Sequence, residues 1–313
     1  MDNGQVLCLG EALVDVVARG DEYSEHPGGS VLNVACGLAQ LEHPVSLAAW
    51  WGRDRHGHLI EEAVRRAGVE ILPGSDGAER TSVAHATLDA QGKARYQFDL
   101  SYSVPRIDPT VVDHLHTGSI AVTVEPGGSQ VVSTVRQIRQ RATISYDPNA
   151  RPTIMGSPAA VLSRIEEVIG LCDLVKASDE DLAWLYPDAT VEEVLRYWTG
   201  LGPTLVVCTR GPAGATALLR DNRELLQVGP IDVPVADTVG AGDSFMAGMV
   251  SGLLSVGLLG GLEARQRLRS ADWSAVQPAL HRAIITSGIT VSHAGAYGPT
   301  LAEVYQVTNA GLA

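Results

Sequence analysis

The feature that most constrains the fold is a regular alternation of short β-rich runs with segments of helical spacing. Runs typical of buried strands occur at 6–9, 45–51, 119–124, 143–147, 173–176 and 204–209. Between them, apolar residues recur at helical spacing over 30–41, 57–67, 129–141, 159–171 and 190–200. Because parallel strands need long crossover connections, the pattern predicts an α/β fold with a mainly parallel sheet flanked by helices.

Two regions depart from this alternation. Residues 81–100 are typical of two strands joined by a turn around 90–92, and with 15–20 they predict a small antiparallel flap. We expect this β-rich lid to span about 15–26 and 81–103. The C-terminal part predicts helices at 243–257 and 275–292, with a surface excursion from 260 to 269. Since no linker or repeat divides the chain, residues 1–313 are expected to form one domain.

Charge and composition limit the possible partners. The net charge of −13 argues against nonspecific binding to nucleic acid or to anionic lipid. The four cysteines form no CxxC pair, which argues against a zinc knuckle or a redox motif. The first residues lack a basic signal-peptide region, and the longest apolar stretches are shorter than a membrane span. We therefore expect a soluble cytoplasmic protein without membrane contacts.

The segment DTVGAGDSFMAGMVSGLL, residues 237–254, predicts an anion site at a helix start. Apolar residues recur with a helical period from 245 to 254, so the helix begins near Gly242. Free N–H groups and the helix dipole attract anions there, while Gly240 and Gly242 allow close approach of a ligand. Asp243 fits two roles equally well from this segment alone: a helix cap, or a general base beside a phosphoryl group.

Two other phosphate-binding motifs are absent from the sequence. No GxxxxGK[ST] occurs, so the chain is not a Walker-A protein. The first strand is followed by GEALVD rather than GxGxxG, which argues against a dinucleotide-dependent dehydrogenase.

With these residues assembled, the chain resembles a PfkB-type carbohydrate kinase of the ribokinase-like superfamily. DTVGAGDSFMAG resembles the C-terminal signature of that family. PGGSVLNVACGLAQL at 27–41 and WGRDRHG at 51–57 resemble its N-terminal signature, and GEALVD at 10–15 its opening strand and turn. The resemblance spans nearly the whole chain and implies a ribokinase-like fold and ATP-dependent phosphorylation of a sugar.

The resemblance implies roles for individual residues. Asp243 matches the catalytic base, and the anion hole corresponds to Gly240, Ala241 and Gly242. Sugar-contacting positions correspond to Asp15, Gly28, Gly29 and Asn33, although Asp15 and Asn33 also suit turns or caps. TRGPAG at 209–214, the 175–185 segment and the 286–300 segment imply nucleotide contacts by Lys176, Ser178, Thr209, Gly211, Gly214 and Ser287.

Ion sites are implied in the same way. The resemblance implies that Asp181 handles Mg²⁺, directly or through water, although an acidic residue at a helix start also has an electrostatic explanation. Many relatives bind a monovalent cation such as K⁺ between two loops. Here the corresponding residues are Asp237, Val239, Thr290, His293 and Gly295, and Asp237 also suits a role in bracing its loop.

The subfamily is indicated by three further segments. VKASDEDLAWL at 175–185 resembles fructokinase-like members. DPNAR at 147–151 resembles a motif shared by fructokinases and 2-keto-3-deoxygluconate kinases, and its Arg151 could bind a phosphate or a substrate oxygen. Related keto-acid kinases carry an arginine in the flap, where this chain has Asp99, so a neutral ketohexose such as fructose is preferred. Tyr96 and Phe98 either cover the sugar or pack within the flap.

Several alternatives stay open at this point. A 2-keto-3-deoxygluconate kinase, a ribokinase or a nucleoside kinase would use the same fold. A regulator that binds sugar or nucleotide without catalysis belongs to a different class, and the intact GAGD argues against it. The expected ligands are a small sugar and ATP with Mg²⁺, and relatives suggest a homodimer formed through the lid.

Overall fold

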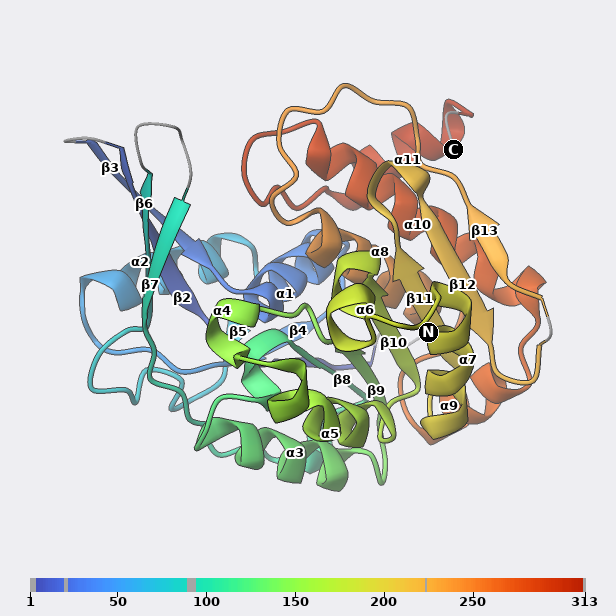
Figure 1. Ribbon diagram of the computed structural model, residues 1–313, viewed down its shortest axis with the longest axis horizontal. Helices are drawn as coiled ribbons and strands as arrows, with labels where there is room; N and C mark the ends of the chain where they lie inside the picture. Colours follow the sequence, from blue (N-terminus) through green and yellow to red (C-terminus); the bar gives the residue numbers. More distant parts are fainter. Residues whose placement is uncertain (1–3, 20–21, 89–93, 223, 312–313) are drawn as a thin grey trace.

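The computed structural model describes residues 4–19, 22–88, 94–222 and 224–311 (Figure 1). Its main sheet has the strand order β13-β12-β11-β10-β9-β8-β1-β4-β5. All pairs from β11 to β5 in this order are parallel. Strand β12 is antiparallel to β11, and β13 is antiparallel to β12. The strands are β1 Val6–Leu9, β4 Val45–Ala48, β5 Glu70–Ile71, β8 His114–Gly118, β9 Thr143–Asp147, β10 Leu174–Ser178, β11 Leu205–Thr209, β12 Ala215–Leu219 and β13 Leu226–Val228. The predicted α/β class is confirmed.

Helices cover both faces of this sheet because alternate strand residues point to opposite sides. In β1, Val6 and Cys8 belong to one core, and Leu7 and Leu9 belong to the other. The first core is covered by α1 Ser30–Gln40, α2 Arg55–Arg66, α8 Ala241–Ser255, α10 Trp273–Val291 and α11 Leu301–Asn309. The second is covered by α3 Gly127–Ile138, α5 Pro158–Ile169, α6 Asp179–Leu185 and α7 Val191–Leu201.

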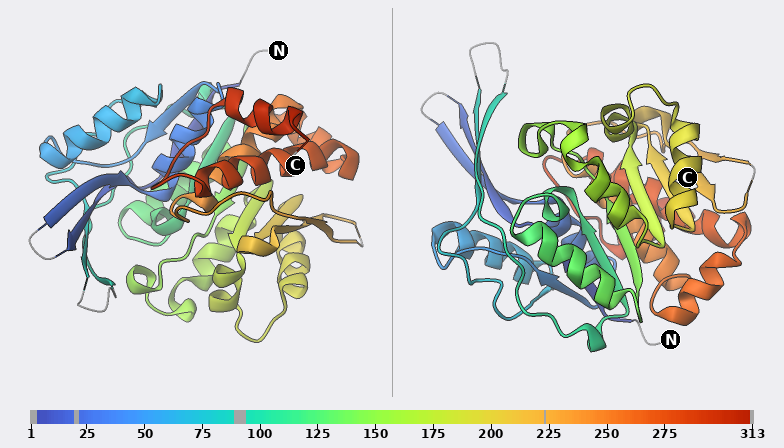
Figure 2. Two further views of the ribbon diagram at one scale, coloured as in Figure 1. Left: turned by 90° about the horizontal axis from the view of Figure 1, so that it is seen from above. Right: turned by 60° about the horizontal axis from the view of Figure 1, so that its bottom comes forward.

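A second, smaller sheet projects from one side of the body (Figure 2). Its strands are β3 Glu22–Gly28, β2 Leu13–Arg19, β6 Val83–Leu88 and β7 Ala94–Asp99, in that order across the sheet. The pairs β2–β3 and β6–β7 are antiparallel, but β2 and β6 are parallel, so the sheet is mixed rather than wholly antiparallel as predicted. The turn predicted at 90–92 lies outside the described residues.

The segment 119–124 is not a strand, which corrects the prediction. Residues Ser119–Val122 form a 3₁₀ turn, and the strand lies just before it, at β8. Its sequence HLHTG lacks an apolar run because His114 and His116 are polar. Both are fully buried: His114 bonds the hydroxyls of Thr143 and Ser145 on the adjacent strand, at 2.8 and 2.9 Å. Satisfied hydrogen bonds let a strand carry polar residues into the core.

The surface excursion predicted at 260–269 is also wrong, because Leu262–Arg269 forms helix α9. Arg265 of this helix is only 7% exposed and forms an ion pair with Asp173 at 2.7 Å. Its guanidinium also donates to the carbonyls of Arg139 and Ala142. Arg265 therefore fixes α9 to the sheet from within a charged segment. A guanidinium can be buried in this way when its N–H donors are hydrogen-bonded.

The buried histidines predict a sensitivity to acid. Burial lowers the pKa of His114 to about 3, so the unfolded chain takes up a proton near pH 6.5 while the folded chain does not. The free energy of unfolding therefore falls as the pH drops below about 6.5, by about 1.4 kcal/mol per pH unit for each such histidine. We expect His114→Gln to make this slope shallower by that amount between pH 6 and 4.5, measured by urea unfolding. His58→Gln, at an exposed position of α2, serves as the control, and an unchanged slope in His114→Gln would contradict the assignment.

Candidate active site

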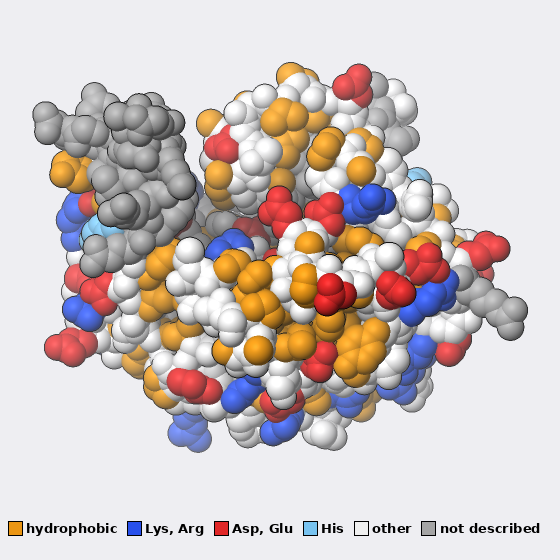
Figure 3. Space-filling model, viewed as in Figure 1, with side chains coloured by type: hydrophobic (Ala, Val, Ile, Leu, Met, Phe, Trp, Pro, Cys, Tyr) orange, Lys and Arg blue, Asp and Glu red, His pale blue; other side chains and the backbone are white. Residues whose placement is uncertain are grey.

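Polar residues gather at one edge of the main sheet, where its parallel strands end. Ligands of open α/β sheets bind at this carboxyl edge. Helix α8 also begins at this edge. Its residue Gly242 lies against Lys176 of β10, since a Cβ on Gly242 would be 2.9 Å from the Nζ of Lys176. Figure 3 shows the surface hollowed beside this region, with acidic and basic side chains along the lower border of the hollow. The residues at the strand ends are Glu11, Asp147, Ser178 and Thr209.

The start of α8 explains the glycines of the GAGD motif. Gly240 is the N-cap residue and has φ +75, a left-handed conformation that favours glycine. A Cβ at this position would lie 2.7 Å from the Cβ of Ala296. No side chain caps the helix, and the Ala241 N–H donates to the carbonyl of Thr238 at 3.3 Å. The positive end of the helix dipole still attracts an anion there. Asp243 is therefore not the cap.

Asp243 is instead bound to the first turn of α1. Its Oδ1 accepts a hydrogen bond from Ser30 Oγ at 2.6 Å, and its Oδ2 accepts one from Asn33 Nδ2 at 2.8 Å. The amide of Asn149 lies 3.5 Å from Oδ1. Burial raises the pKa of Asp243, and the bonds from Ser30 and Asn33 oppose that rise. A desolvated carboxylate with a raised pKa is well suited to accept a proton.

Lys176 and Asp147 form a buried ion pair directly behind the helix start. Nζ of Lys176 lies 2.8 Å from Oδ2 of Asp147, and their side chains are 4% and 0% exposed. Burial alone would lower the pKa of Lys176, but Asp147, Asp181 and Asp243 together raise it, so the ammonium stays charged. The structure thus places a buried cation directly behind Gly242 at the start of α8. The predicted contact of Lys176 with a nucleotide stays a prediction.

Asp181 is engaged in the backbone of its own helix. Its carboxylate accepts bonds from the N–H and hydroxyl of Ser178 at 2.8 and 2.7 Å, which forms a capping box at the start of α6. The other oxygen accepts from the Ala150 N–H at 2.7 Å. Among the described residues, no three acidic, histidine or cysteine side chains form a group that could hold a metal ion.

The residues predicted to contact a sugar lie where the second sheet joins α1. A Cβ on Gly28 would lie 2.3 Å from the Oδ2 of Asp15, so the two residues are in close contact. Gly29 has φ +120, and a Cβ there would lie 2.6 Å from the carbonyl oxygen of Glu11. Burial raises the pKa of Asp15, and Arg151 and His26 oppose that rise. The glycines therefore let α1 begin directly beside the carboxylate.

The remaining substrate candidates are distributed around this junction. Phe98 is half-buried in β7, and the side chain of Tyr96 lies outside the described part of the structure. Arg151 follows β9 and donates to Oδ1 of Asn149 at 2.7 Å. Burial raises the pKa of Glu11, Asp15 and Asp243, and the charge of Arg151 opposes that rise at each of them, so Arg151 lies near these acids.

The predicted nucleotide residues lie further along the same edge. Thr209 ends β11 and donates to the Ala177 carbonyl on β10 at 3.4 Å. Gly211 has φ +48, and a Cβ there would meet nothing within 4 Å, so its surface is open. Gly214 has φ +78 and lies against the backbone of Val228. Ser287 is half-buried on α10, in the helix that packs against α8.

The residues predicted for a monovalent cation form a loop junction. Asp237 accepts hydrogen bonds from the N–H groups of Val239 and Gly295, at 3.1 and 2.9 Å. Thr290 Oγ1 lies 2.8 Å from the Tyr297 carbonyl, and the His293 ring stacks on Tyr297 at 4.0 Å. Asp237 thus links its own loop to the loop that contains Gly295, which is the bracing role that the sequence also suggested for it.

Sequence reasoning missed four residues of the site: Glu11, Ser30, Asp147 and Asn149. All four lie inside quoted motifs, at GEALVD, PGGS and DPNAR. Only the fold shows that their side chains meet, because Ser30 and Asp243 are 213 positions apart. Glu11 is 5% exposed, and burial raises its pKa to about 7.

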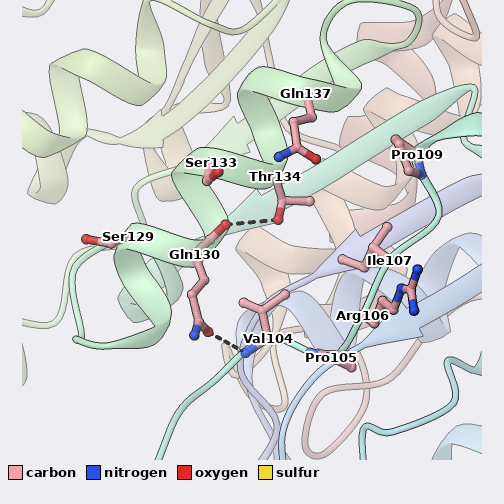
Figure 4. Close-up of a pocket in the computed structure, with 10 residues that line it drawn as sticks. All are labelled: Val104, Pro105, Arg106, Ile107, Pro109, Ser129, Gln130, Ser133, Thr134 and Gln137. Atoms are coloured by element: carbon pink, nitrogen blue, oxygen red, sulfur yellow. Dashed lines mark hydrogen bonds between the residues drawn. The ribbon is translucent and has the colours of Figure 1, made fainter.

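A separate surface pocket lies between the 104–109 segment and α3 (Figure 4). The side chain of Gln130 crosses its floor and accepts from the Val104 N–H at 2.9 Å. None of the residues that line it belongs to the site described above.

Comparison with known proteins decides the family. The model of the pfkB family carbohydrate kinases matches residues 3–290. The chain belongs to the pfkB family. As a pfkB carbohydrate kinase, it is a phosphotransferase whose acceptor is an alcohol group of a sugar.

The relatives of this pfkB kinase include several fructokinases. The fructokinase of Klebsiella pneumoniae is 31% identical over 273 residues, covering 84% of this chain and 88% of that protein. The fructokinase of Rhizobium leguminosarum bv. trifolii is 29% identical over 285 residues, covering 87% and 85%.

Solved structures share the fold. A fructokinase from Xylella fastidiosa with bound ATP has a TM-score of 0.84 at 22% identity, covering 99% of both chains. A fructokinase from Vibrio cholerae O395 with fructose, ADP and potassium ion bound has a TM-score of 0.78 at 24% identity, covering 97% of this chain and 98% of that one. These likenesses show a ribokinase-like fold. In the described part of this pfkB kinase, no helix is long and apolar enough to cross a membrane.

Proposed function

We propose that this kinase transfers the γ-phosphoryl group of ATP to the primary hydroxyl O6 of fructose. The observation that carries the proposal is Asp243, a buried carboxylate beside a helix start whose N–H groups have no side-chain cap. The names of the curated relatives support fructose as the acceptor.

The reaction follows from this arrangement. The acceptor hydroxyl gives its proton to Asp243 as its oxygen attacks the γ-phosphorus, and the bond to the bridging oxygen of ADP breaks. The N–H groups of Gly240, Ala241 and Gly242 stabilise the charge on the transferred group. The ammonium of Lys176, behind Gly242, adds positive charge in a desolvated place.

The charges around the acceptor favour a neutral sugar. Arg151 faces all three of Glu11, Asp15 and Asp243, and Lys176 also faces Asp243. The acids outnumber these cations, so a carboxylate on the substrate would be repelled. Asp99, on which the sequence argument depended, instead forms an ion pair with Arg80 at 2.8 Å. The preference for fructose over a keto acid therefore rests on these three acids rather than on Asp99.

We expect Asp15→Ala to weaken fructose binding because a carboxylate can hold sugar hydroxyls through charge-assisted bonds. Loss of such bonds costs about 1.5–3 kcal/mol, so the KM for fructose should rise about 10- to 100-fold. The KM for ATP should stay within about threefold. Initial rates at varied fructose and ATP measure both. Asp99→Ala, on the same small sheet, is the control, and a wild-type KM for fructose in Asp15→Ala would remove Asp15 from the sugar site.

The proposed reaction uses Mg²⁺, and a K⁺ ion is proposed beside it. Mg²⁺ brought by ATP would neutralise phosphate charge when bound, and we propose that Asp181, at the start of α6, contacts its water shell. A K⁺ ion would be held by backbone oxygens near Asp237, Val239, Thr290, His293 and Gly295. Rates measured with K⁺ and with Na⁺ test this part of the proposal.

We also propose that the second sheet acts as a lid, closing over the sugar and excluding water. Its exposed Tyr23, 72% accessible on β3, and its free outer strand suit a homodimer of lids. Light scattering coupled to size exclusion tests the dimer, which a monomer at all concentrations would contradict. A cytoplasmic location fits the use of ATP.

ADP release with a panel of acceptors tests the proposed function. The panel contains fructose, ribose, 2-keto-3-deoxygluconate and adenosine, each with Mg·ATP. We expect fructose to give the highest kcat/KM, and ³¹P NMR to show the product phosphorylated at O6. A higher kcat/KM for any other acceptor would replace fructose, and release independent of any acceptor would indicate a hydrolase.

A further inference from the structure

Ser30 occupies a position that the proposed reaction has not yet used. It is the first residue of α1 and follows β3 through Gly29, with only 5% of its surface exposed. Its backbone N–H donates to Oε1 of Glu11 at 3.0 Å, and its hydroxyl donates to Oδ1 of Asp243 at 2.6 Å. Ser30 is therefore fixed at two points, with the base at one of them.

The hydroxyl bond to Asp243 is short and isolated from water. A donor–acceptor distance of 2.6 Å is typical of a hydroxyl bound to an ionised carboxylate, which is about twice as strong as a neutral bond. The other oxygen of Asp243 is bound by Asn33, so each oxygen has its own donor on the same helical turn. This arrangement fixes the rotation of the carboxylate as well as its position.

We propose that Ser30 is a positioning residue whose hydroxyl holds Asp243 ionised and oriented for deprotonation of the acceptor alcohol. The proposal rests on the proposed kinase reaction, in which Asp243 is the base. A hydrogen bond to the charged form of an acid favours that form, and burial acts in the opposite direction. Without Ser30, Asp243 would take up a proton at a higher pH.

Other charged groups facing Asp243 remain in place when Ser30 is changed. Lys176 on β10 and Arg151 after β9 face it as cations. Asp147 at the end of β9 and Glu11 after β1 face it as acids. A change in the titration of Asp243 in a Ser30 variant is therefore due to the lost hydroxyl.

The pH dependence of kcat/KM for fructose in Ser30→Ala tests the proposal. Loss of the hydrogen bond should change the ionisation equilibrium of Asp243 about tenfold or more. The acid limb of the profile, where kcat/KM falls at low pH, should therefore move up by about one pH unit. Activity should fall about tenfold on the acid side of the limb and less than about threefold on the plateau above it. Ser30→Thr keeps the hydroxyl and should restore the wild-type limb. Ser251→Ala removes a buried hydroxyl of α8 that bonds His43 and Arg282, and should leave the limb unmoved.

An unmoved acid limb in Ser30→Ala would overturn the proposal while leaving the kinase assignment intact. A second measurement needs no substrate. A double-mutant cycle of Ser30→Ala and Asp243→Asn should give a coupling of about tenfold in the unfolding equilibrium constant at pH 8. That coupling should fall below about threefold at a pH where Asp243 is protonated. Equal coupling at both pH values would also overturn the proposal, even if the enzyme proves to act on another acceptor.

Discussion

Asp243→Asn is expected to lower the turnover of fructose by at least about 10²- to 10⁴-fold, the usual contribution of a general base. Asparagine has nearly the same shape and still fills the space beside Ser30 and Asn33, but it cannot accept the proton of the acceptor hydroxyl. The fold should survive because the change removes a charge whose burial opposes ionisation. Coupled ADP release measures turnover, and circular dichroism measures the fold.

The control is Asp113→Asn, the same chemical change at an exposed carboxylate that accepts from the Gln5 N–H at 2.9 Å. It should retain full turnover. The KM for fructose should change little in Asp243→Asn, since asparagine can still hydrogen-bond the acceptor hydroxyl and the other sugar contacts are unchanged. Wild-type turnover in Asp243→Asn would remove the base from the mechanism.

Lys176→Met is expected to reduce both stability and activity. It leaves Asp147 buried without its partner, and breaking a buried ion pair in this way costs about 3–5 kcal/mol of unfolding free energy. Burial already raises the pKa of Asp147 to about 6, so the unpaired carboxyl takes up a proton as the pH falls. A raised folded-state pKa of an acid makes stability fall as the pH rises, so the loss should be larger at pH 8 than at pH 5. Urea unfolding at both pH values measures it.

Turnover of folded Lys176→Met should also fall, by about tenfold, because the anion hole loses the cation behind Gly242. Arg265→Met is the matched control, since it breaks a second buried ion pair of the described residues, with Asp173, at the amino end of β10 and so at the opposite edge of the sheet from the site. It should lose similar stability and keep its turnover at a temperature where it is folded. Equal turnover losses in the two variants would mean that Lys176 acts only through stability.

The sequence was sufficient for the fold class, and it predicted the helix start that carries Asp243. Helical spacing after GAGD placed the start of α8 within a residue, because glycine and the apolar period are local signals. Strand β8 was not predicted because its two histidines interrupt the apolar pattern of a buried strand. Their hydrogen-bond partners, which allow their burial, lie on β9 and are not visible in the local sequence. Helix α9 escaped because the contact that buries Arg265 comes from Asp173, 92 positions away.

The side-chain partners within the site were not predictable for the same reason. Sequence reasoning assigned Lys176 to the nucleotide and Asp181 to Mg²⁺, whereas the structure pairs Lys176 with Asp147 and binds Asp181 into a capping box. Motifs specify which residues approach a site, and packing decides which atoms remain free in it.

A crystal structure with fructose and a non-hydrolysable ATP analogue tests the central claim most directly. We predict that, with the lid closed, an oxygen of the carboxylate at position 243 lies about 2.6–3.2 Å from O6 of the sugar, within reach of its proton. A closed complex that leaves this oxygen more than about 4 Å from every sugar hydroxyl, with no bridging water, would contradict the account.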